Sequence, residues 1–82
     1  MLNEMDVSIY PNPANNELKL ILPIEPVKVG IYSLYGSLLN EVMADSIQEV
    51  AIDTSSYANG TYFVRLSSTS LNLIKRIIVF HD

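Results

Sequence analysis

The segment Asp53–Val64, DTSSYANGTYFV, has a glycine two positions before a tyrosine that opens an alternating apolar run. The alternation continues to Leu66, so Tyr62, Val64 and Leu66 share one face of a predicted strand while Arg65 faces outward. In many immunoglobulin-like sandwiches, a tyrosine at such a corner bonds a backbone group a few residues upstream through its hydroxyl. Tyr62 is therefore the predicted corner tyrosine; the alternative is that it fills the core edge with its hydroxyl in water.

The same period of two governs two further runs, residues 18–22 and 27–32, and weaker runs lie at residues 5–10, 38–43, 48–52 and 71–80. Turn-forming residues separate all of them, and no segment shows the apolar stripe of an amphipathic helix. The sequence therefore predicts an all-β fold, an immunoglobulin-like antiparallel β-sandwich of about seven short strands. The predicted inward-facing residues of the two clearer runs are Leu18, Leu20, Leu22, Val27, Val29 and Ile31.

Length and composition limit the function. A chain of 82 residues forms one domain, and its 49% hydrophobic and 17% charged residues suit a folded protein rather than a disordered tail. The net charge of −4 argues against binding nucleic acid, which needs clustered Lys and Arg to displace counterions. No apolar run reaches the ~20 residues of a membrane-spanning helix. The initial MLNEMD lacks the order of a signal peptide, and with no cysteine there is no disulfide framework.

Two prolines bracket an asparagine in the stretch IYPNPANN, residues 9–16. Each proline fixes φ and removes an N–H donor, and each holds the residue before it in extended geometry. The stretch is therefore predicted to end the first strand and to send the chain to the other sheet. Asn12, Asn15 and Asn16 are predicted to bond nearby backbone groups within the turn.

Four stretches together resemble the C-terminal sorting domain of the type IX (Por) secretion system. In order, they are VSIYPNPANNELKLIL, VKVGIYSLYGSLLNEV, VAIDTSSYANGTYFVRL and LIKRIIVF. The resemblance runs from about Val7 to Phe80, and the order of four motifs makes it far more specific than a lone Pro-Asn-Pro would be.

The resemblance assigns sorting-motif roles to single residues, with Lys75 and Arg76 opening the last strand. Thr54 and Tyr57 depart from the family pattern, which has small hydrophobic residues there, and Asn59 precedes the corner glycine. Tyr57 is the departure that we expect to alter how the corner loop packs. The assigned residues are Tyr10, Pro11, Asn12, Pro13, Ala14, Gly36, Asp53, Ser55, Gly60, Tyr62, Val64, Lys75 and Arg76.

The resemblance implies a non-catalytic secretion signal that directs a larger cargo protein across the outer membrane. It implies an N-terminal cargo domain in the same chain, residues 1–6 as the linker from that cargo, and residues 7–82 as the sorting domain. The implied route leads through the periplasm to the cell surface or the extracellular medium. The implied partners are the translocon and the sortase of the type IX system, the sortase often removing the tail and attaching the cargo to the surface. No cofactor is implied.

The last predicted strand, residues 71–80, is apolar on both faces. Its exposed edge could pair with a strand of a partner, including a second copy in a homodimer joined through edge strands. Alternatively, both faces are covered within the domain, one by the core and the other by preceding loops or a second copy.

Catalytic and metal sites find little support in the residues. The single histidine, His81, is expected to be a solvated terminal residue, and one histidine without cysteine falls short of any zinc set. The spacing of Asp45, Glu49 and Asp53 matches no calcium loop. We therefore expect no enzyme, no metal and no cofactor.

The alternative function is an accessory adhesion or carbohydrate-binding domain of a surface protein. In that case Tyr10, Tyr32, Tyr35 and Tyr57 would form an aromatic platform for sugar rings, although tyrosines also commonly occupy strand ends.

Overall fold

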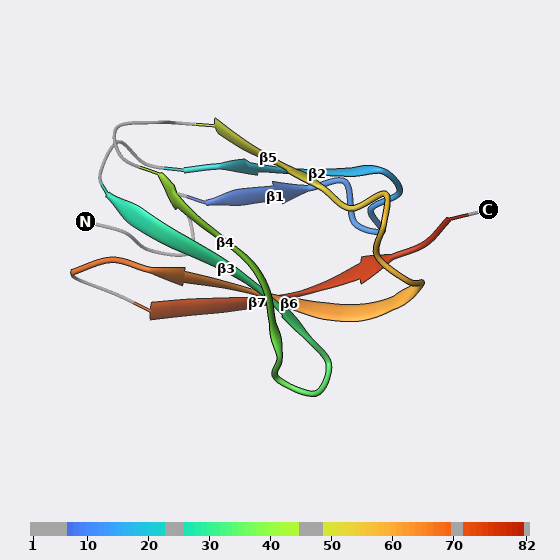
Figure 1. The fold of residues 1–82 in the computed structure, drawn as a ribbon. Coiled ribbons are helices and arrows are strands. Elements are labelled where there is room, and N and C mark those ends of the chain that lie inside the picture. The colour runs from blue at the N-terminus through green and yellow to red at the C-terminus, as the bar shows by residue number, and fades with distance from the viewer. Residues whose placement is uncertain (1–6, 23–25, 45–48, 70–71, 82) are drawn as a thin grey trace.

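The computed structural model describes residues 7–22, 26–44, 49–69 and 72–81. They form seven antiparallel strands in two layers, which confirms the predicted sandwich (Figure 1). The strands are β1 (Ser8–Tyr10), β2 (Glu17–Ile21), β3 (Val27–Ser33), β4 (Leu38–Ala44), β5 (Glu49–Asp53), β6 (Gly60–Ser67) and β7 (Asn72–Val79). Among these residues there is no helix that is long and apolar enough to cross a membrane.

The two sheets have the strand orders β1-β2-β5 and β4-β3-β6-β7. The chain passes between the sheets after β2, after β4 and after β5, so strands adjacent in sequence often belong to different layers. The last of these passages is the corner loop, residues 54–59. Strand β7 pairs only with β6 among the strands and therefore lies at an edge of its sheet.

The core lies between the sheets and is formed by the predicted inward faces. Burial of one such large side chain stabilises the fold by about 1.5–3 kcal/mol before the entropy cost of ordering the chain is subtracted. Thr54 is the buried polar residue within the described ranges. The buried apolar residues are Ala14, Leu18, Leu20, Leu22, Val27, Val29, Ile31, Ala44, Val50, Ile52, Tyr62, Val64, Leu66, Ile77 and Val79.

Strand β7 departs from two expectations. Lys75 and Arg76 lie in its middle rather than at its start, because Asn72 to Ile74 continue the ladder opposite Ser67 to Arg65 of β6. The expectation that both faces of this strand are covered within the domain is also wrong. One face, with Ile77 and Val79, is buried, whereas on the other Ile74, Ile78 and Phe80 are 61%, 41% and 56% exposed.

The corner tyrosine is confirmed. The Tyr62 hydroxyl donates a hydrogen bond to the main-chain oxygen of Ala58, four residues upstream, at 2.5 Å. The Tyr57 ring packs against the Tyr62 ring with centroids 5.2 Å apart and the planes tilted by 34°. The hydroxyl of Tyr57 is itself buried and has no hydrogen-bond partner among the described residues. Burial raises the pKa of Tyr57, and the neighbouring Tyr62 and Asp53 raise it further.

Removal of the hydroxyl group is predicted to destabilise the fold at Tyr62 but not at Tyr57. Tyr62→Phe should lower the free energy of unfolding by about 1 kcal/mol, because the Ala58 carbonyl loses its partner. Tyr57→Phe should leave the stability unchanged or raise it by up to about 1 kcal/mol, because it removes an unsatisfied buried hydroxyl. Urea unfolding of both variants checks this, and equal destabilisation by the two would contradict it.

Candidate functional site

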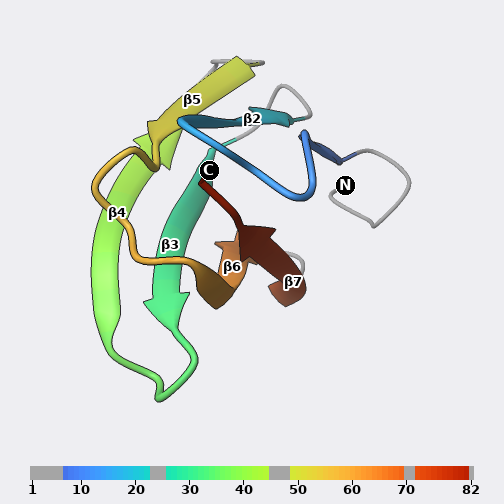
Figure 2. The ribbon, with the colours of Figure 1, turned by 90° about the vertical axis from the view of Figure 1, so that its right-hand side faces the viewer.

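Most of the sorting-motif residues lie at one end of the sandwich, which we call the motif end. Strands β1, β3, β5 and β7 all run toward this end (Figure 1). The loop 11–16, the β3–β4 hairpin, the corner loop and the last residues of β7 therefore meet there, while β1 starts at the opposite end. Figure 2 looks directly onto the motif end, with the C-terminal segment lying between the loop 11–16 and the corner loop.

The first motif is hydrogen-bonded to the edge of β7. The Ala14 N–H donates to the Ile78 oxygen at 2.7 Å, and the Phe80 N–H donates to the Ala14 oxygen at 2.8 Å. Ala14 thereby forms a parallel bridge with Val79, and no part of it is exposed. The Ile78 N–H donates to Oδ1 of Asn12 at 3.0 Å. This motif thus closes the C-terminal half of an edge that would otherwise present unpaired main-chain groups.

The prolines on either side of Asn12 both follow cis peptide bonds, Tyr10–Pro11 and Asn12–Pro13. The side chain of Asn12 reaches a residue 66 positions away instead of the local backbone predicted for it. Tyr10 ends β1, and the residues from Pro11 to Pro13 are exposed.

The corner loop is bonded to the loop 11–16 through Thr54. Its N–H donates to the Asn16 oxygen at 2.9 Å, and its hydroxyl donates to the Asn15 oxygen at 3.0 Å. Thr54 is fully buried, and these two bonds satisfy its N–H and its hydroxyl. A small hydrophobic residue at this position would fill the same space but would leave the Asn15 oxygen without this donor.

His81 is held by three residues from two loops, so the expectation of a solvated terminal residue is wrong. Its N–H donates to Oδ1 of Asn59 at 2.7 Å, and Nδ2 of Asn59 donates to its carbonyl at 3.2 Å. Its imidazole Nε2 lies 2.9 Å from the main-chain carbonyl oxygen of Tyr57, and Nδ1 lies 2.9 Å from Oδ1 of Asn15. Because a carbonyl oxygen only accepts, Nε2 is the donor in the bond to Tyr57. The ring therefore ties the end of the chain to the corner loop and the loop 11–16.

Asp53 and Ser55 form a tight turn at the start of the corner. One carboxylate oxygen of Asp53 accepts from the Ser55 hydroxyl at 2.6 Å and from the Ser55 N–H at 2.9 Å. These two bonds, the hydroxyl bond first, lower the pKa of Asp53 below its ordinary value, because they favour the charged form. The following residues then lead to Gly60, Tyr62 and the buried Val64 in β6.

The remaining motif residues border the same end. Gly36 has φ +90°, a value that favours glycine, and its N–H donates to the Ser33 oxygen at 3.0 Å to close the hairpin. Hairpin and corner residues, including Leu34 and Asn59, line a common hollow. Lys75 and Arg76 line a separate hollow with Asn12. These basic residues thus lie beside the first motif, but they belong to the middle of β7 and not to a loop.

The aromatic platform expected for sugar binding is not formed. Tyr57 packs on Tyr62 at the corner, Tyr10 ends β1 in the three-stranded sheet, and Tyr32 lies across Gly30 on the four-stranded sheet. Tyr35 lies in the hairpin loop. Within the described ranges no group of three or more His, Asp or Glu side chains is arranged to hold a metal ion; Asp45 lies outside those ranges.

Sequence reasoning missed the residues that join the motifs. Asn15 and His81 meet although 66 residues separate them, and Asn59 brackets the main chain of His81. The available signal in the sequence was the position of two polar residues, Asn15 after the proline-rich turn and Asn59 before the corner glycine. Their partners could not be read from spacing, because each bond depends on which loops share one end of the sandwich.

The turn at Asp53 predicts a dependence of stability on pH. Its folded-state pKa lies below the ordinary 3.8, so the carboxylate stabilises the fold above about pH 4, and this contribution disappears as the pH falls through the folded-state pKa. Ser55→Ala should raise the pKa of Asp53 toward its ordinary value and should reduce this acid-dependent loss. NMR titration of the carboxyl, with urea unfolding at about pH 6 and about pH 2.5, measures both. An unchanged Asp53 pKa in Ser55→Ala would contradict the assignment.

Comparison with known proteins agrees with the order of the motifs. A family model, the secretion system C-terminal sorting domain, matches residues 8–80, which is nearly the whole chain. A search of curated proteins finds no match. Both sheets and every described motif residue lie within the matched range. The chain therefore belongs to the family of type IX secretion C-terminal sorting domains, whose members act as export signals and in general not as catalysts.

Proposed function

We propose that residues 7–82 form a folded export signal whose motif end is recognised by the outer-membrane translocon of the type IX system. Family membership supports the general role, a sorting signal for export to the cell surface or extracellular space. In the proposed route the cargo precedes the tail and reaches the translocon through the periplasm. A sortase then removes the tail at a bond near or before the linker, residues 1–6, and attaches the cargo to the surface. Those six residues lie outside the described ranges.

The observation that carries the proposal is that contacts distant in sequence build the motif end. Asn12 with Ile78, and Asn15 with His81, are each 66 residues apart. An unfolded tail therefore cannot present these groups together, whereas a folded tail presents them whatever cargo precedes it. A translocon that accepts many cargoes needs such a feature, because the tail is what those cargoes share.

The placement of the cargo side also supports the proposal. Strand β1 begins at the end of the sandwich opposite the motif end (Figure 1). A cargo domain joined ahead of Ser8 would therefore sit away from the loop 11–16, the corner loop and His81. The proposed recognition surface would stay accessible while the cargo is still attached.

Point variants test this proposal better than truncation. Removal of the last eight residues would take Ile77 and Val79 out of the core, so loss of export could result from unfolding alone. Asn12→Ala and His81→Ala remove bonds made at the surface and leave the buried apolar residues in place. Asn40→Ala, at an exposed position of β4, is the matched control.

The experiment uses a periplasm-directed fluorescent reporter fused ahead of residues 1–82. It is expressed in a strain with an active type IX system and in a translocon-null strain. The parent tail should deliver reporter to the surface or medium in the first strain only. Asn12→Ala and His81→Ala should each reduce export by about fivefold, the change expected when a bond of about 1 kcal/mol no longer holds the end in place. Asn40→Ala should export like the parent.

Two outcomes would count against this proposal in different ways. A stable parent fusion retained in the periplasm of both strains would contradict the sorting role and would favour the adhesion alternative. Full export of folded Asn12→Ala and His81→Ala would leave the sorting role intact and would contradict recognition at the motif end. Circular dichroism of the purified tails shows whether each variant is folded.

A further inference from the structure

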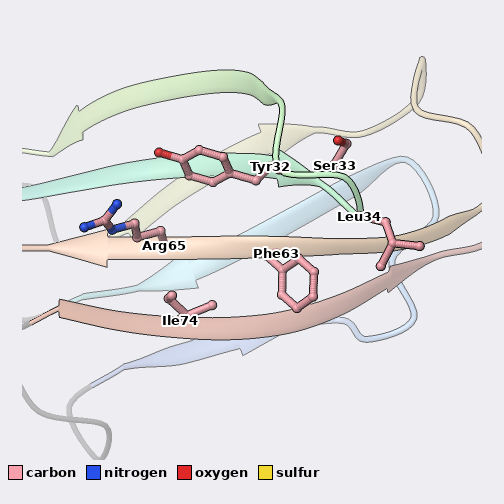
Figure 3. A pocket seen from close by; sticks show the side chains of 7 residues that line it. Tyr32, Ser33, Leu34, Phe63, Arg65 and Ile74 are labelled. Atoms are coloured by element: carbon pink, nitrogen blue, oxygen red, sulfur yellow. The ribbon is translucent and has the colours of Figure 1, made fainter.

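The outer face of the four-stranded sheet carries an apolar hollow that begins at the β3–β4 hairpin and lies away from the loop 11–16 and the corner loop. Its volume is about 370 Å³. Figure 3 shows side chains from the hairpin, β3, β6 and β7 around it, with Phe63 in the middle of the view, Arg65 and Ile74 on one side of it and Leu34 on the other. Large apolar side chains on a sheet face are normally covered, so a contiguous set in water marks an interaction surface. Its lining residues are Tyr32, Ser33, Leu34, Gly36, Phe63, Arg65 and Ile74.

A second hollow, of about 250 Å³, continues this surface toward the other end of the sheet. It has Tyr32 and Arg65 in common with the first, and Lys28, Glu41 and Asn72 are among its other lining residues. The Tyr32 ring lies so close over Gly30 that a Cβ there would be 2.8 Å from Cε1 of the ring. We call the two hollows together the outer groove. It runs along β3 and β6, and Asn72 and Ile74 border it on the side of β7.

The outer face of the four-stranded sheet has two arginines that pair with no described carboxylate, Arg65 in the outer groove and Arg76 beside it on β7. Lys28 pairs with Glu41 at 3.5 Å, but no carboxylate of the described residues lies within ion-pair distance of Arg65 or Arg76. This excess of positive charge stands out in a chain of net charge −4. The outward positions of the other sheet instead carry Glu17, Glu49 and Asp53, beside Lys19. Charge complementarity therefore favours an anionic partner on this face alone.

The adjoining edge of β7 favours a polypeptide as that partner. The Ile78 N–H and oxygen face outward and are bonded by Asn12 and Ala14. Since main-chain groups alternate in direction along a strand, those of Ile74 and Arg76 face the same way, and no described main-chain group bonds them. Such an edge matches the regularly spaced row of N–H and C=O groups along an extended polypeptide, a spacing that sugars and lipids do not have.

A second copy of this chain fits the edge less well. Pairing of two β7 edges in antiparallel register would bring the Arg76 side chains of both copies into the same small region. Like charges near one another on paired strands are destabilising. The same charge that opposes self-pairing selects a partner segment with carboxylates.

We propose that the edge of β7 at Ile74 and Arg76, together with the side of the outer groove that borders β7, docks one extended polypeptide segment that carries large apolar side chains and carboxylates. The segment adds to the edge at Ile74 and Arg76. Its apolar side chains lie against Ile74 and Phe63, and a carboxylate pairs with Arg65. The inference rests on the proposed function in one respect, that the segment belongs to the export machinery.

Photo-crosslinking in the export-competent strain tests the inference. A benzoylphenylalanine is placed at Ile74 in the reporter fusion, and at the exposed Ala51 of β5 as the control. The probe at position 74 should crosslink to one polypeptide segment that contains apolar and acidic residues, and the probe at position 51 should not. Arg65→Glu should reduce both the crosslink and export at least about fivefold. Lys19→Glu, the same change of charge on the other sheet, should leave both within about twofold.

The outcomes separate this inference from the proposed function. A parent tail that is not exported contradicts the proposed function and the inference with it. If the parent tail is exported, any of three results would overturn the docking surface and leave the proposed function intact. Position 51 crosslinks as strongly as position 74, the crosslinked partner is lipopolysaccharide or a second copy, or folded Arg65→Glu crosslinks like the parent.

Discussion

The structure depends on two main-chain hydrogen bonds that join Ala14 to Ile78 and Phe80. A chain of 82 residues has a thin core and, without cysteine, no disulfide between its sheets. Ala14 leaves the three-stranded sheet and adds to the edge of the other one, so the layers are joined by backbone as well as by packing. Position 14 tolerates no large side chain, because Ala14 is fully buried within the core. A small side chain is therefore required where the backbone approaches so closely.

The residues that depart from the family pattern have physical roles in this chain. Thr54 satisfies a main-chain oxygen of the loop 11–16, and Asn59 brackets the main chain of His81. Tyr57 supplies a ring to pack on Tyr62 and a carbonyl to the imidazole of His81. The expectation that Tyr57 alters the packing of the corner is consistent with its buried hydroxyl, which lacks a described partner. The side chains of Thr54 and Asn59 connect the corner loop to the loop 11–16 and to the C-terminal segment, through bonds that small hydrophobic side chains could not form.

The two halves of the edge strand β7 differ in the hydrogen bonds that their outward main-chain groups make. Asn12 and Ala14 close its C-terminal half, while the half with Ile74 and Arg76 has no described main-chain partner. A basic residue at such an edge opposes aggregation and self-pairing while it leaves the edge open to an acidic partner. The two sheets thus have distinct outer surfaces, one largely acidic and one apolar with arginines that pair with no described carboxylate. A small domain can in this way have a fixed motif end and, on a different surface, the docking face that we propose.

The sequence by itself determined the strands, their inward faces and the corner, because each rests on neighbouring residues: a period of two, a turn glycine, and a tyrosine four residues from its acceptor. It also indicated the family, through four motifs in order. Only the tertiary structure decided which loops share one end, that the side chain of Asn12 bonds Ile78 and not its own turn, and that His81 is fixed. It also decided that one face of β7 stays exposed. These features depend on how the sheets are stacked and how strands pair over long separations, and local patterns carry no information about either.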